Sequence, residues 1–558
     1  MREIIKGFQA TSQDDYQLNV TNIIKHAARN YGGQEIAARR PDGTMFRYTY
    51  REAYERMQRL ANALKGLGAT VGDRIGILAW NTRETYEIFF GVPGTGSVML
   101  LLNLRLLPQQ LSWVVNHSSP RFIIVDESLI PLAEEIAAES QKVEGYIIIT
   151  DKDMRDIKTK LRPVYSYEAL LDGAEPQFNW PNLDERSAYG ACYTTGTTGR
   201  PKGVYYSHRN VFLHSSNLII RLGMGITDCS YQITPIFHIM GWCFPQASTM
   251  VGAKLVYPGK YSLDELEALS RIMVQEKVSL ANGAPAFFLA LLQYFRTLKE
   301  PPNLGGARLL MGGSEPPLDM IKGYHDLVNA EVIHAYGATE TTPVISCNRP
   351  KPWLDRKLSE PDRWDLKRKQ GYFSVMIDVK AVDLRGNEVP HDGKTPGEIL
   401  LRGPWVTGAY YDAPGSEAQF TEDGYWRSGD IGTLDPEGFL KITDRLKDVI
   451  KSGGEWISSV DLENAIIAHP SVVEAAVVGV PHAKWEERPL ALVVLREGSA
   501  EKMNADEIRS HLSKTFAKWQ LPDKVLFVKS IPKTSVGKYD KKVIREQYKD
   551  AYTGVQSR

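Results

Sequence analysis

The chain has 558 residues, more than one hydrophobic core usually organises, so several domains are expected. It carries 67 basic and 67 acidic residues. This balance argues against a protein whose main role is to bind a nucleic-acid backbone or an anionic membrane surface, although local charged patches stay open. An apolar fraction of 43% is ordinary for a soluble globular protein.

The cysteines and the N-terminal residues indicate in which cellular compartment the protein is expected. The four cysteines form no Cys-x-x-Cys pair, which favours a reducing environment over a disulfide framework. The first residues lack the apolar core of a signal peptide. The longest apolar run, 284–292, contains a proline and is far shorter than the ~18 residues that a membrane-spanning helix needs. We expect a soluble, cytoplasmic protein.

The first third of the chain alternates between helices and strands. Apolar residues between Met57 and Leu67 recur on one helical face, and a second helix is expected around 84–90. Short apolar strands are expected at 74–79, 98–102, 122–125 and 146–149. Continuous apolar strands that alternate with helices predict an α/β arrangement with a largely buried sheet.

The most informative segment runs from Tyr193 to Val204. It combines four threonines, three glycines and Lys202 between two predicted strands, 188–193 and 204–206. Glycines let backbone N–H groups point at an anion, hydroxyls donate further hydrogen bonds, and lysine adds a positive charge. The spacing differs from the Walker A loop, which leads into a helix. A surface turn rich in Gly and Thr is the alternative, but the flanking strands and the lysine favour a phosphate-binding loop.

Later segments complete the expected fold. A second α/β set covers 187–342, and after the charged stretch 351–370 short strands continue to Ile442, which predicts a small β-barrel-like unit. The last hundred or so residues form a compact α+β domain, with a helix that begins near a Ser458-x-x-Asp461 capping pattern. Strands are expected there at 474–480, 490–495 and 525–528.

The loop at 193–204 resembles the signature of the adenylate-forming superfamily, which comprises acyl-CoA synthetases, luciferases and peptide-synthetase adenylation domains. Two further segments strengthen the resemblance: 336–340, Tyr-Gly-Ala-Thr-Glu, and 312–316, Gly-Gly-Ser-Glu-Pro. The resemblance implies that Tyr336 stacks on adenine, that Glu340 holds Mg²⁺, and that the second segment forms a wall beside adenine and the acyl group. A carboxylate is a suitable hard ligand for Mg²⁺. Read alone, each segment is only a turn after a buried strand.

Four segments near the C-terminus also match the superfamily. In 425–430 the resemblance implies that Asp430 holds the ribose hydroxyls. In 444–448 it implies that Arg445 reaches the ribose or phosphate and that Lys447 is a hinge; many relatives have glycine where Asp444 stands. In 451–459 the glycine pair is expected to line the path of the thiol, and in 532–538 Lys538 is expected to be the catalytic lysine. The implied domains are 1–443, the hinge 444–448 and a mobile C-terminal domain, 449–558.

The segment 237–242, Phe-His-Ile-Met-Gly-Trp, corresponds to the superfamily motif at the carboxylate end of the acyl site. His238 is expected to position substrate rather than act as a base, since a histidine beside an apolar strand is more often structural. Trp242 matches a gate tryptophan of the fatty-acid branch, with a buried core tryptophan as an equal alternative. With Trp456, these features are most similar to bacterial and archaeal medium- to long-chain fatty acyl-CoA synthetases.

The resemblance implies an ATP-dependent acid–CoA ligase that forms an acyl-adenylate, with Mg²⁺ as cofactor and a carboxylic acid, ATP and coenzyme A as substrates. Expected catalytic residues are Lys538, Lys202, Glu340, Thr194 and Arg445, and expected metal ligands are Thr194 and Glu340. The expected ATP or AMP residues are Thr194, Thr195, Gly196, Thr197, Thr198, Gly199, Lys202, Gly313, Ser314, Glu315, His334, Ala335, Tyr336, Gly337, Thr339, Asp430, Arg445, Lys447, Lys451 and Lys538. The expected acyl and coenzyme A residues are His238, Ile239, Trp242, Gly453, Gly454 and Trp456.

Three alternatives stay open. A CoA ligase for an aryl or a short branched or hydroxylated acid is the nearest, because the motifs concern the nucleotide and not the acid. A luciferase or adenylation domain fits less well, and a nucleotide-binding regulator on an inactive scaffold is opposed by intact Lys202, Glu340, Asp430 and Lys538. Nucleic acid and an integral membrane span are not expected as partners, and a homodimer is compatible with the sequence.

Overall fold

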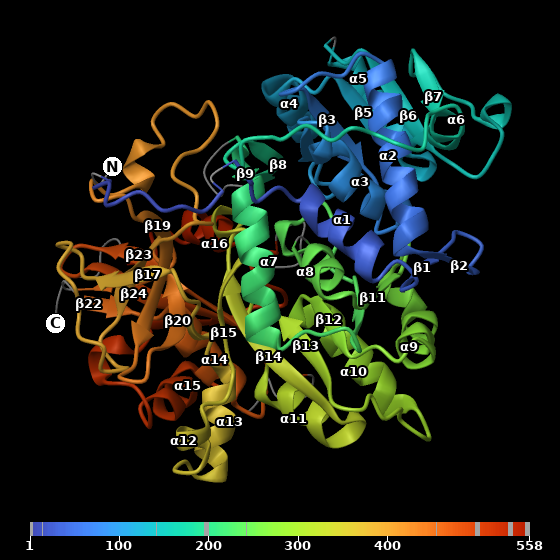
Figure 1. Ribbon diagram of the computed structural model, residues 1–558. Helices are drawn as coiled ribbons and strands as arrows, with labels where there is room; N and C mark the ends of the chain where they lie inside the picture. The colour runs from blue at the N-terminus through green and yellow to red at the C-terminus, as the bar shows by residue number, and fades with distance from the viewer. Residues whose placement is uncertain are drawn as a thin grey trace. The chain divides into compact units, whose positions relative to one another are not determined.

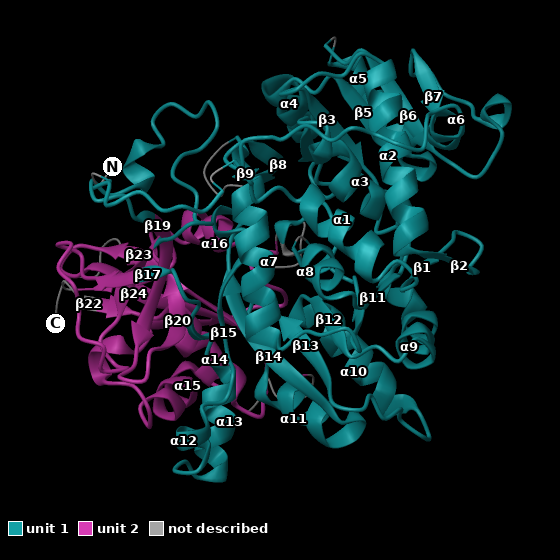
Figure 2. Cartoon of the chain, viewed as in Figure 1, with its two compact units in different colours: residues 1–378, 402–426 teal, residues 379–401, 427–558 magenta. Residues whose placement is uncertain are grey.

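A computed structural model gives the fold, and it describes residues 4–13, 15–140, 142–194, 200–241, 243–452, 455–496, 503–533 and 539–552. The chain divides into two compact units, coloured in Figure 2. Unit 1 comprises residues 1–378 and 402–426, and unit 2 comprises 379–401 and 427–558. The predicted mixture of a large α/β region and a smaller α+β region is confirmed. Residues 427–443 belong to unit 2, and the domain boundary at 443/444 and the hinge stay predictions.

One sheet of unit 1 has the strand order β7-β6-β5-β3-β4-β8-β9. Its strands are β3 Arg74–Leu78, β4 Val98–Leu101, β5 Phe122–Asp126, β6 Gly145–Ile149, β7 Val164–Ser166, β8 Ala188–Thr194 and β9 Lys202–Ser207. Pairing is parallel except between the last two strands. The four early strands lie where their continuous apolar runs predict them, because a sheet buried on both faces needs apolar side chains on both.

A second sheet of unit 1 follows the order β2-β1-β11-β10-β12-β13-β14-β15-β16. These strands are β1 Glu35–Arg39, β2 Met45–Thr49, β10 Cys229–Tyr231, β11 Lys254–Tyr257, β12 Leu280–Gly283, β13 Ala307–Met311, β14 Ala330–Gly337, β15 Val344–Cys347 and β16 Gly371–Phe373. The strands β10, β12, β13 and β14 run parallel, so their carboxyl ends share one edge. Ligands bind at such edges in open α/β sheets.

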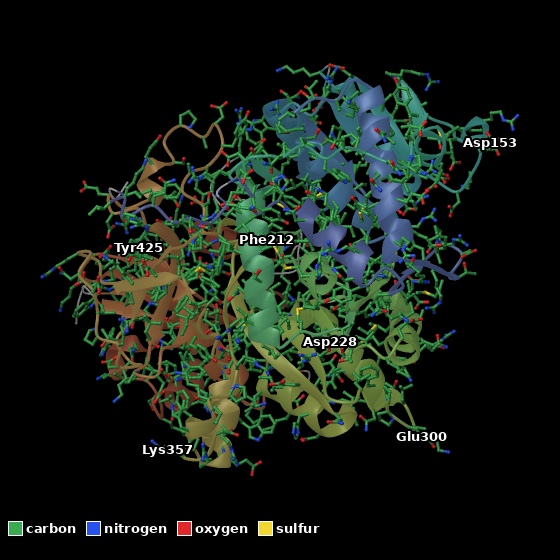
Figure 3. The ribbon with its side chains drawn as sticks, in the orientation of Figure 1. Asp153, Phe212, Asp228, Glu300, Lys357 and Tyr425 are labelled. Carbon is green, nitrogen blue, oxygen red and sulfur yellow. The ribbon has the colours of Figure 1, made fainter. Side chains whose placement is uncertain are left out.

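Asp228, labelled in Figure 3, fixes the opposite, amino-terminal ends of these parallel strands. Its carboxylate accepts a hydrogen bond from the Ser279 hydroxyl (2.6 Å) and forms an ion pair with Arg308. The backbone N–H of Gly225 also donates to it (2.8 Å). Because Ser279 precedes β12 and Arg308 lies in β13, this one carboxylate sets the alignment of three neighbouring strands.

Helices of unit 1 cover both sheets. They are α1 Thr21–Asn30, α2 Tyr50–Gly66, α3 Arg83–Gly94, α4 Pro108–Ser118, α5 Ile130–Ala138, α6 Tyr167–Asp172, α7 His208–Leu222, α8 Phe244–Val251, α9 Leu266–Gln275, α10 Pro285–Thr297, α11 Leu318–Val328, α12 Pro352–Asp355 and α13 Glu360–Arg368, with short 3-10 turns that include η3 Ile239–Gly241 and η5 Thr339–Thr341. Helix α8 packs against both α1 and α7 (Figure 1).

One large apolar core joins the two sheets of unit 1. It contains side chains from α1, α2, α3, α7 and α8 together with Ile77 of β3 and Leu280 of β12, and Phe212 on α7 packs against it (Figure 3). A separate cluster lies between the second sheet and α9, α10 and α11. No helix within the described ranges is both long enough and apolar enough to cross a bilayer. All four cysteines are buried free thiols.

Apart from the boundary residues Asp378, Arg402 and Trp426, unit 2 contains the strands β17 Asp378–Val382, β18 Gly397–Arg402, β19 Trp426–Leu434 and β20 Phe439–Arg445 in that spatial order. They lie in the region where a small β unit was predicted. The remaining elements of unit 2 are β21 Ile450–Ser452, β22 Glu455–Ile457, α14 Ser459–Ile467, β23 Val472–His482, β24 Glu486–Leu495, α15 Ala505–Leu512, β25 Lys524–Phe527 and α16 Lys541–Gln547. The predicted helix start is confirmed, because the Ser458 hydroxyl accepts from the Asp461 N–H (3.0 Å).

Candidate functional site

The threonine- and glycine-rich loop joins two antiparallel strands, as the sequence predicts. Thr194 ends β8, Lys202 begins β9, and the two residues are register partners. Pairing therefore places a hydroxyl and an ammonium-bearing side chain at the same end of the hairpin. Residues 195–199 of the predicted loop, which are Thr195, Gly196, Thr197, Thr198 and Gly199, lie outside the described residues.

Tyr410 connects the lysine of this hairpin to the predicted metal ligand. The Lys202 ammonium lies 4.8 Å from the centroid of the Tyr410 ring, within cation–π range. The Tyr410 hydroxyl donates to Glu340 Oε1 (2.7 Å) and accepts from the Trp426 indole N–H (3.1 Å). Thus Lys202 and Glu340, more than a hundred residues apart, belong to one local arrangement within unit 1.

The electrostatics of this arrangement keep the Tyr410 hydroxyl protonated. Burial raises the pKa of Tyr410 well above its ordinary value, and the neighbouring Glu340 charge raises it further. The tyrosine therefore stays protonated and donates, and a carboxylate accepts this bond best in its charged form. The Glu340 backbone is fixed as well, because its carbonyl accepts from the Thr407 N–H (2.7 Å), while the Tyr206 hydroxyl donates to the Thr339 carbonyl (2.7 Å).

The strand β14 brings four predicted nucleotide residues to the carboxyl edge. Tyr336 pairs with Ser346, and a register shift follows at Gly337. A side chain at Gly337 would overlap the Pro343 carbonyl oxygen, so only glycine fits there. His334 is buried and its Nδ1 lies 2.7 Å from the Arg368 carbonyl; burial lowers the pKa of this histidine to about 4. Ala335 is buried in the core.

The loop after β13 carries the other predicted wall of the nucleotide site. Gly313 (φ +92°) and Ser314 are exposed, whereas Glu315 is half-buried and pairs with Arg368 of α13 (Nε–Oε1 2.8 Å, Nη2–Oε1 2.6 Å). Since the Arg368 carbonyl also contacts His334, the end of α13 links this loop to β14.

The segment after β10 reaches the same edge. Its backbone is held by Asn81, whose side-chain N–H groups donate to the Thr234 carbonyl (2.8 Å) and whose Oδ1 accepts from the Ile236 N–H (3.0 Å). His238 is exposed, whereas its neighbour Ile239 is buried in the core.

In unit 2 the structure brings together the predicted ribose and phosphate residues. Asp430 on β19 and Arg445 on β20 are register partners, and Arg445 Nε lies 2.6 Å from Asp430 Oδ1. Asp430 is buried, whereas Arg445 and Lys447 are exposed. Lys451 and Trp456 pair across the β21–β22 hairpin. The remaining predictions, Trp242, Gly453, Gly454 and Lys538, lie outside the described residues.

Sequence reasoning missed Tyr410, Trp426 and Arg368 as site residues. Two adjacent tyrosines after Gly408 are a usable signal, because bulky aromatic residues in a loop that glycine and proline interrupt need a packing partner. No such signal marks Arg368, which looks like one cation in the charged stretch 351–370.

We expect Tyr410→Phe to lower the rate of acyl-adenylate formation by about 3- to 10-fold, because Glu340 loses a charge-assisted hydrogen bond. Tyr411→Phe is the matched control: its backbone N–H bonds the Gly203 carbonyl (2.9 Å) and its ring packs on Tyr205, and both contacts survive the change. Pyrophosphate release with acid and ATP measures the rate. Equal rates in the two variants would contradict a role for the Tyr410 hydroxyl.

Comparison with known proteins gives the family. The family model for AMP-binding enzyme matches residues 24–411, and that for the AMP-binding enzyme C-terminal domain matches residues 461–538. The chain is 41% identical to a long-chain-fatty-acid–CoA ligase of Thermus thermophilus, over 99% of each chain. It is 38% identical to a 3-methylmercaptopropionyl-CoA ligase of Ruegeria lacuscaerulensis, over 96% of this chain and 98% of that protein.

The fold agrees with these matches. The crystal structure of ATP-bound MatB from Rhodopseudomonas palustris superposes with a TM-score of 0.78 at 26% identity, covering 96% of this chain and all of the other. Most of the chain is thus matched in sequence and in fold. The protein is a member of the AMP-binding enzyme family.

Proposed function

We propose that the protein is an ATP-dependent fatty acid–CoA ligase. It joins a carboxylic acid to AMP with release of pyrophosphate and then transfers the acyl group to coenzyme A. The observation that carries this proposal is the arrangement of Lys202 and Glu340 around Tyr410 at the carboxyl end of the strands. A cation and a carboxylate at one edge suit a nucleoside triphosphate with its metal ion.

The chemistry explains why ATP is consumed. A carboxylate resists nucleophiles because of its charge. In the first step a carboxylate oxygen forms a bond to the α-phosphorus of ATP, and the bond from that phosphorus to pyrophosphate breaks. In the second step the thiol sulfur of coenzyme A bonds to the acyl carbon, the thiol proton is lost, and AMP leaves with the electron pair of the broken C–O bond. Lys202 would balance the charge on the departing phosphates.

The side chains at this edge fit a hard cation. Glu340 and Thr194 would hold Mg²⁺, because carboxylate and hydroxyl oxygens are suitable ligands and the other positions would go to phosphate oxygens and water. The metal ion would supply positive charge that neutralises the phosphates. Tyr410 would orient Glu340 for this task through its 2.7 Å hydrogen bond.

Residues of unit 2 would serve the nucleotide and the second step. Asp430 is a natural acceptor for two ribose hydroxyls, and its partner Arg445 would orient that carboxylate or reach a phosphate. Lys538 would neutralise charge between the acid and the α-phosphate. Rotation about Lys447 would then exchange this lysine for the Gly453–Gly454 segment, which would border the path of the thiol.

A medium- or long-chain fatty acid is the proposed substrate. The Thermus relative is named for long-chain fatty acids. In unit 1 Ile239 of η3, Phe244 of α8, Leu280 of β12 and Leu310 of β13 belong to one buried apolar cluster. We place the acyl chain against such a cluster, with His238, Ile239 and Trp242 near the carboxylate end.

A shorter or more polar acid is the second candidate. The Ruegeria relative is named for 3-methylmercaptopropionate. Buried polar side chains around α8 favour this reading: Ser248 donates to Ser230 (2.8 Å), and Gln246 donates to the Tyr189 hydroxyl (2.8 Å). The acyl group selected by the enzyme decides between the two.

A series of straight-chain acids tests the fatty-acid proposal. Each buried methylene contributes about 0.8 kcal/mol, which equals about a fourfold factor in kcat/KM. We expect kcat/KM for CoA ligation to rise from acetate through octanoate until the pocket is full. Benzoate and 3-methylmercaptopropionate serve as comparison substrates. Activity that peaks at acetate, benzoate or the thioether acid and vanishes by octanoate would support the second candidate instead.

A further inference from the structure

A buried charged cluster lies where the predicted hinge begins. Asp444, near the end of β20, is 3% exposed. Its Oδ2 accepts from both the backbone N–H (2.5 Å) and the hydroxyl (2.6 Å) of Ser459. Ser459 is the first residue of α14, and a carboxylate at a helix N-terminus is favoured by the helix dipole. The side chain of Asp444 therefore joins the end of a strand to the start of a helix.

Lys541 completes the cluster from a third element, α16. Its ammonium donates to the Ser459 hydroxyl oxygen (2.6 Å) and lies 2.8 Å from Glu463 Oε1. Burial raises the pKa of Asp444 and that of Glu463, and the Lys541 charge opposes both shifts. Two buried carboxylates thus share one largely buried ammonium, and losing one member of such a group is costly.

The cluster spans the predicted hinge residue. Asp444 precedes Lys447 in the chain, whereas Ser459 and Lys541 follow it. A neighbouring bond also spans it, from the Ser458 hydroxyl to the Thr443 carbonyl (2.7 Å).

A second contact of α16 does not span that residue. Arg545 pairs with Asp448 (3.0 Å), and both follow Lys447. Helix α16 therefore contacts the hinge segment at both ends. A rotation about Lys447 would break its link to Asp444 and would leave the pair of Arg545 and Asp448 intact.

The cluster also adjoins the segment of Lys538. Lys541 follows it by three positions in the sequence. The described ends of that segment are joined, because Lys533 and Tyr539 form an antiparallel bridge. Asp540 caps α16 by accepting from the Val543 N–H (3.1 Å). Two hydrogen bonds, one between Asp444 and Ser459 and one between Ser459 and Lys541, thus connect β20 to α16. Helix α16 follows the predicted catalytic lysine in the chain.

We propose that Asp444, acting through Ser459 and Lys541, stabilises one of the two orientations of the C-terminal domain and is a positioning residue for the two-step reaction. This inference rests on the proposed function, in which the two half-reactions use different orientations. Rotation about Lys447 would carry Ser459 and Lys541 away from Asp444, so the bonds form in one orientation only. A bond made in only one of two states shifts their populations toward that state.

The test compares the two half-reactions in Asp444→Ala. Pyrophosphate release with acid and ATP alone measures adenylation, and conversion of supplied acyl-adenylate with coenzyme A measures thioester formation. We expect the ratio of the two rates to change about tenfold, since hydrogen bonds to a charged group are lost. Ser459→Ala keeps the N–H donor and should shift the ratio in the same direction by a smaller factor. The pair of Lys541 and Glu463 stays neutral in both variants, which favours folding.

Arg545→Met is the matched control, because it removes an α16 contact that lies entirely beyond Lys447. Its ratio should stay within twofold of the wild type. Thermal melting followed by circular dichroism reports folding. Equal losses of both half-reactions in Asp444→Ala would show a merely structural role and overturn the proposal. The proposal would also be overturned if Arg545→Met shifted the ratio of the two rates as much as Asp444→Ala does.

Trypsin cleavage gives a readout that needs no activity. Arg445 and Lys447 are exposed cleavage positions within the hinge segment. Cleavage follows the population of the opened form when opening is fast. We expect intact-mass analysis without substrates to show cleavage at these two positions about tenfold faster in Asp444→Ala than in the wild type. Unchanged cleavage would overturn the proposal, whereas a wild type that forms no acyl-adenylate would overturn the proposed function alone.

Discussion

Lys538→Ala is expected to slow acyl-adenylate formation by ~10²–10³-fold, because an electrostatic contact to the developing charge commonly contributes that much. Its ammonium would balance charge as the acid oxygen approaches the α-phosphate. Once the adenylate exists, this charge is no longer needed. The variant should therefore fail with acid plus ATP but convert supplied acyl-adenylate to thioester at a near-normal rate. Both rates are measured in single-turnover experiments.

Two further variants complete this experiment. Lys542→Ala removes an exposed lysine just after the same segment and should leave both half-reactions unchanged. Lys447→Pro should show the reverse of Lys538→Ala, with adenylation retained and thioester formation lost, because a fixed φ resists the hinge change. If Lys538→Ala and Lys447→Pro lose both half-reactions equally, domain rotation fails as an account of this protein and Lys538 is structural.

Glu340→Ala is expected to slow adenylation by more than tenfold, a loss of at least ~1.4 kcal/mol of transition-state stabilisation. The carboxylate is the charged acceptor at the hairpin edge, and its loss also removes the partner of the Tyr410 hydroxyl. The defect should be largest at limiting Mg²⁺ and should shrink as the concentration of Mg²⁺ rises. A Mg²⁺ titration of pyrophosphate release measures both effects.

Glu331→Gln provides the matched control for Glu340. It lies on β14, the strand that leads to η5, and pairs with Arg349 at the partly exposed end of that strand (2.9 Å). Its removal should leave the Mg²⁺ dependence unchanged. Wild-type turnover by Glu340→Ala at limiting Mg²⁺ would remove Glu340 from the metal site.

Much of the fold and the order of the site segments could be predicted from local sequence alone. The strands β3 to β6 and β8 lie where continuous apolar runs predict them, because each run records burial on both faces of a sheet. The hairpin that brings Thr194 opposite Lys202 follows from two strands separated by a short glycine-rich loop. These features depend on residues close together in the chain, so their spacing is visible in the sequence.

Tertiary packing alone decided which distant side chains meet. Tyr410 reaches Glu340 across 70 residues, and its role depends on a loop that returns to β9 through the Tyr411 N–H bond to Gly203. Arg368 lies in a charged stretch that reads as solvated, yet the end of its helix docks beside Glu315.

The cluster of Asp444, Ser459 and Lys541 shows the same division. The sequence marks Asp444 only as a departure from glycine at a predicted hinge. It contains no sign that this carboxylate is buried or that a lysine nearly a hundred residues later neutralises it. The periodicity of apolar residues and the preferences of turn-forming residues act over a few positions, so the sequence alone can predict them. The pairing of buried charges depends on which elements pack together, and only the folded chain determines that.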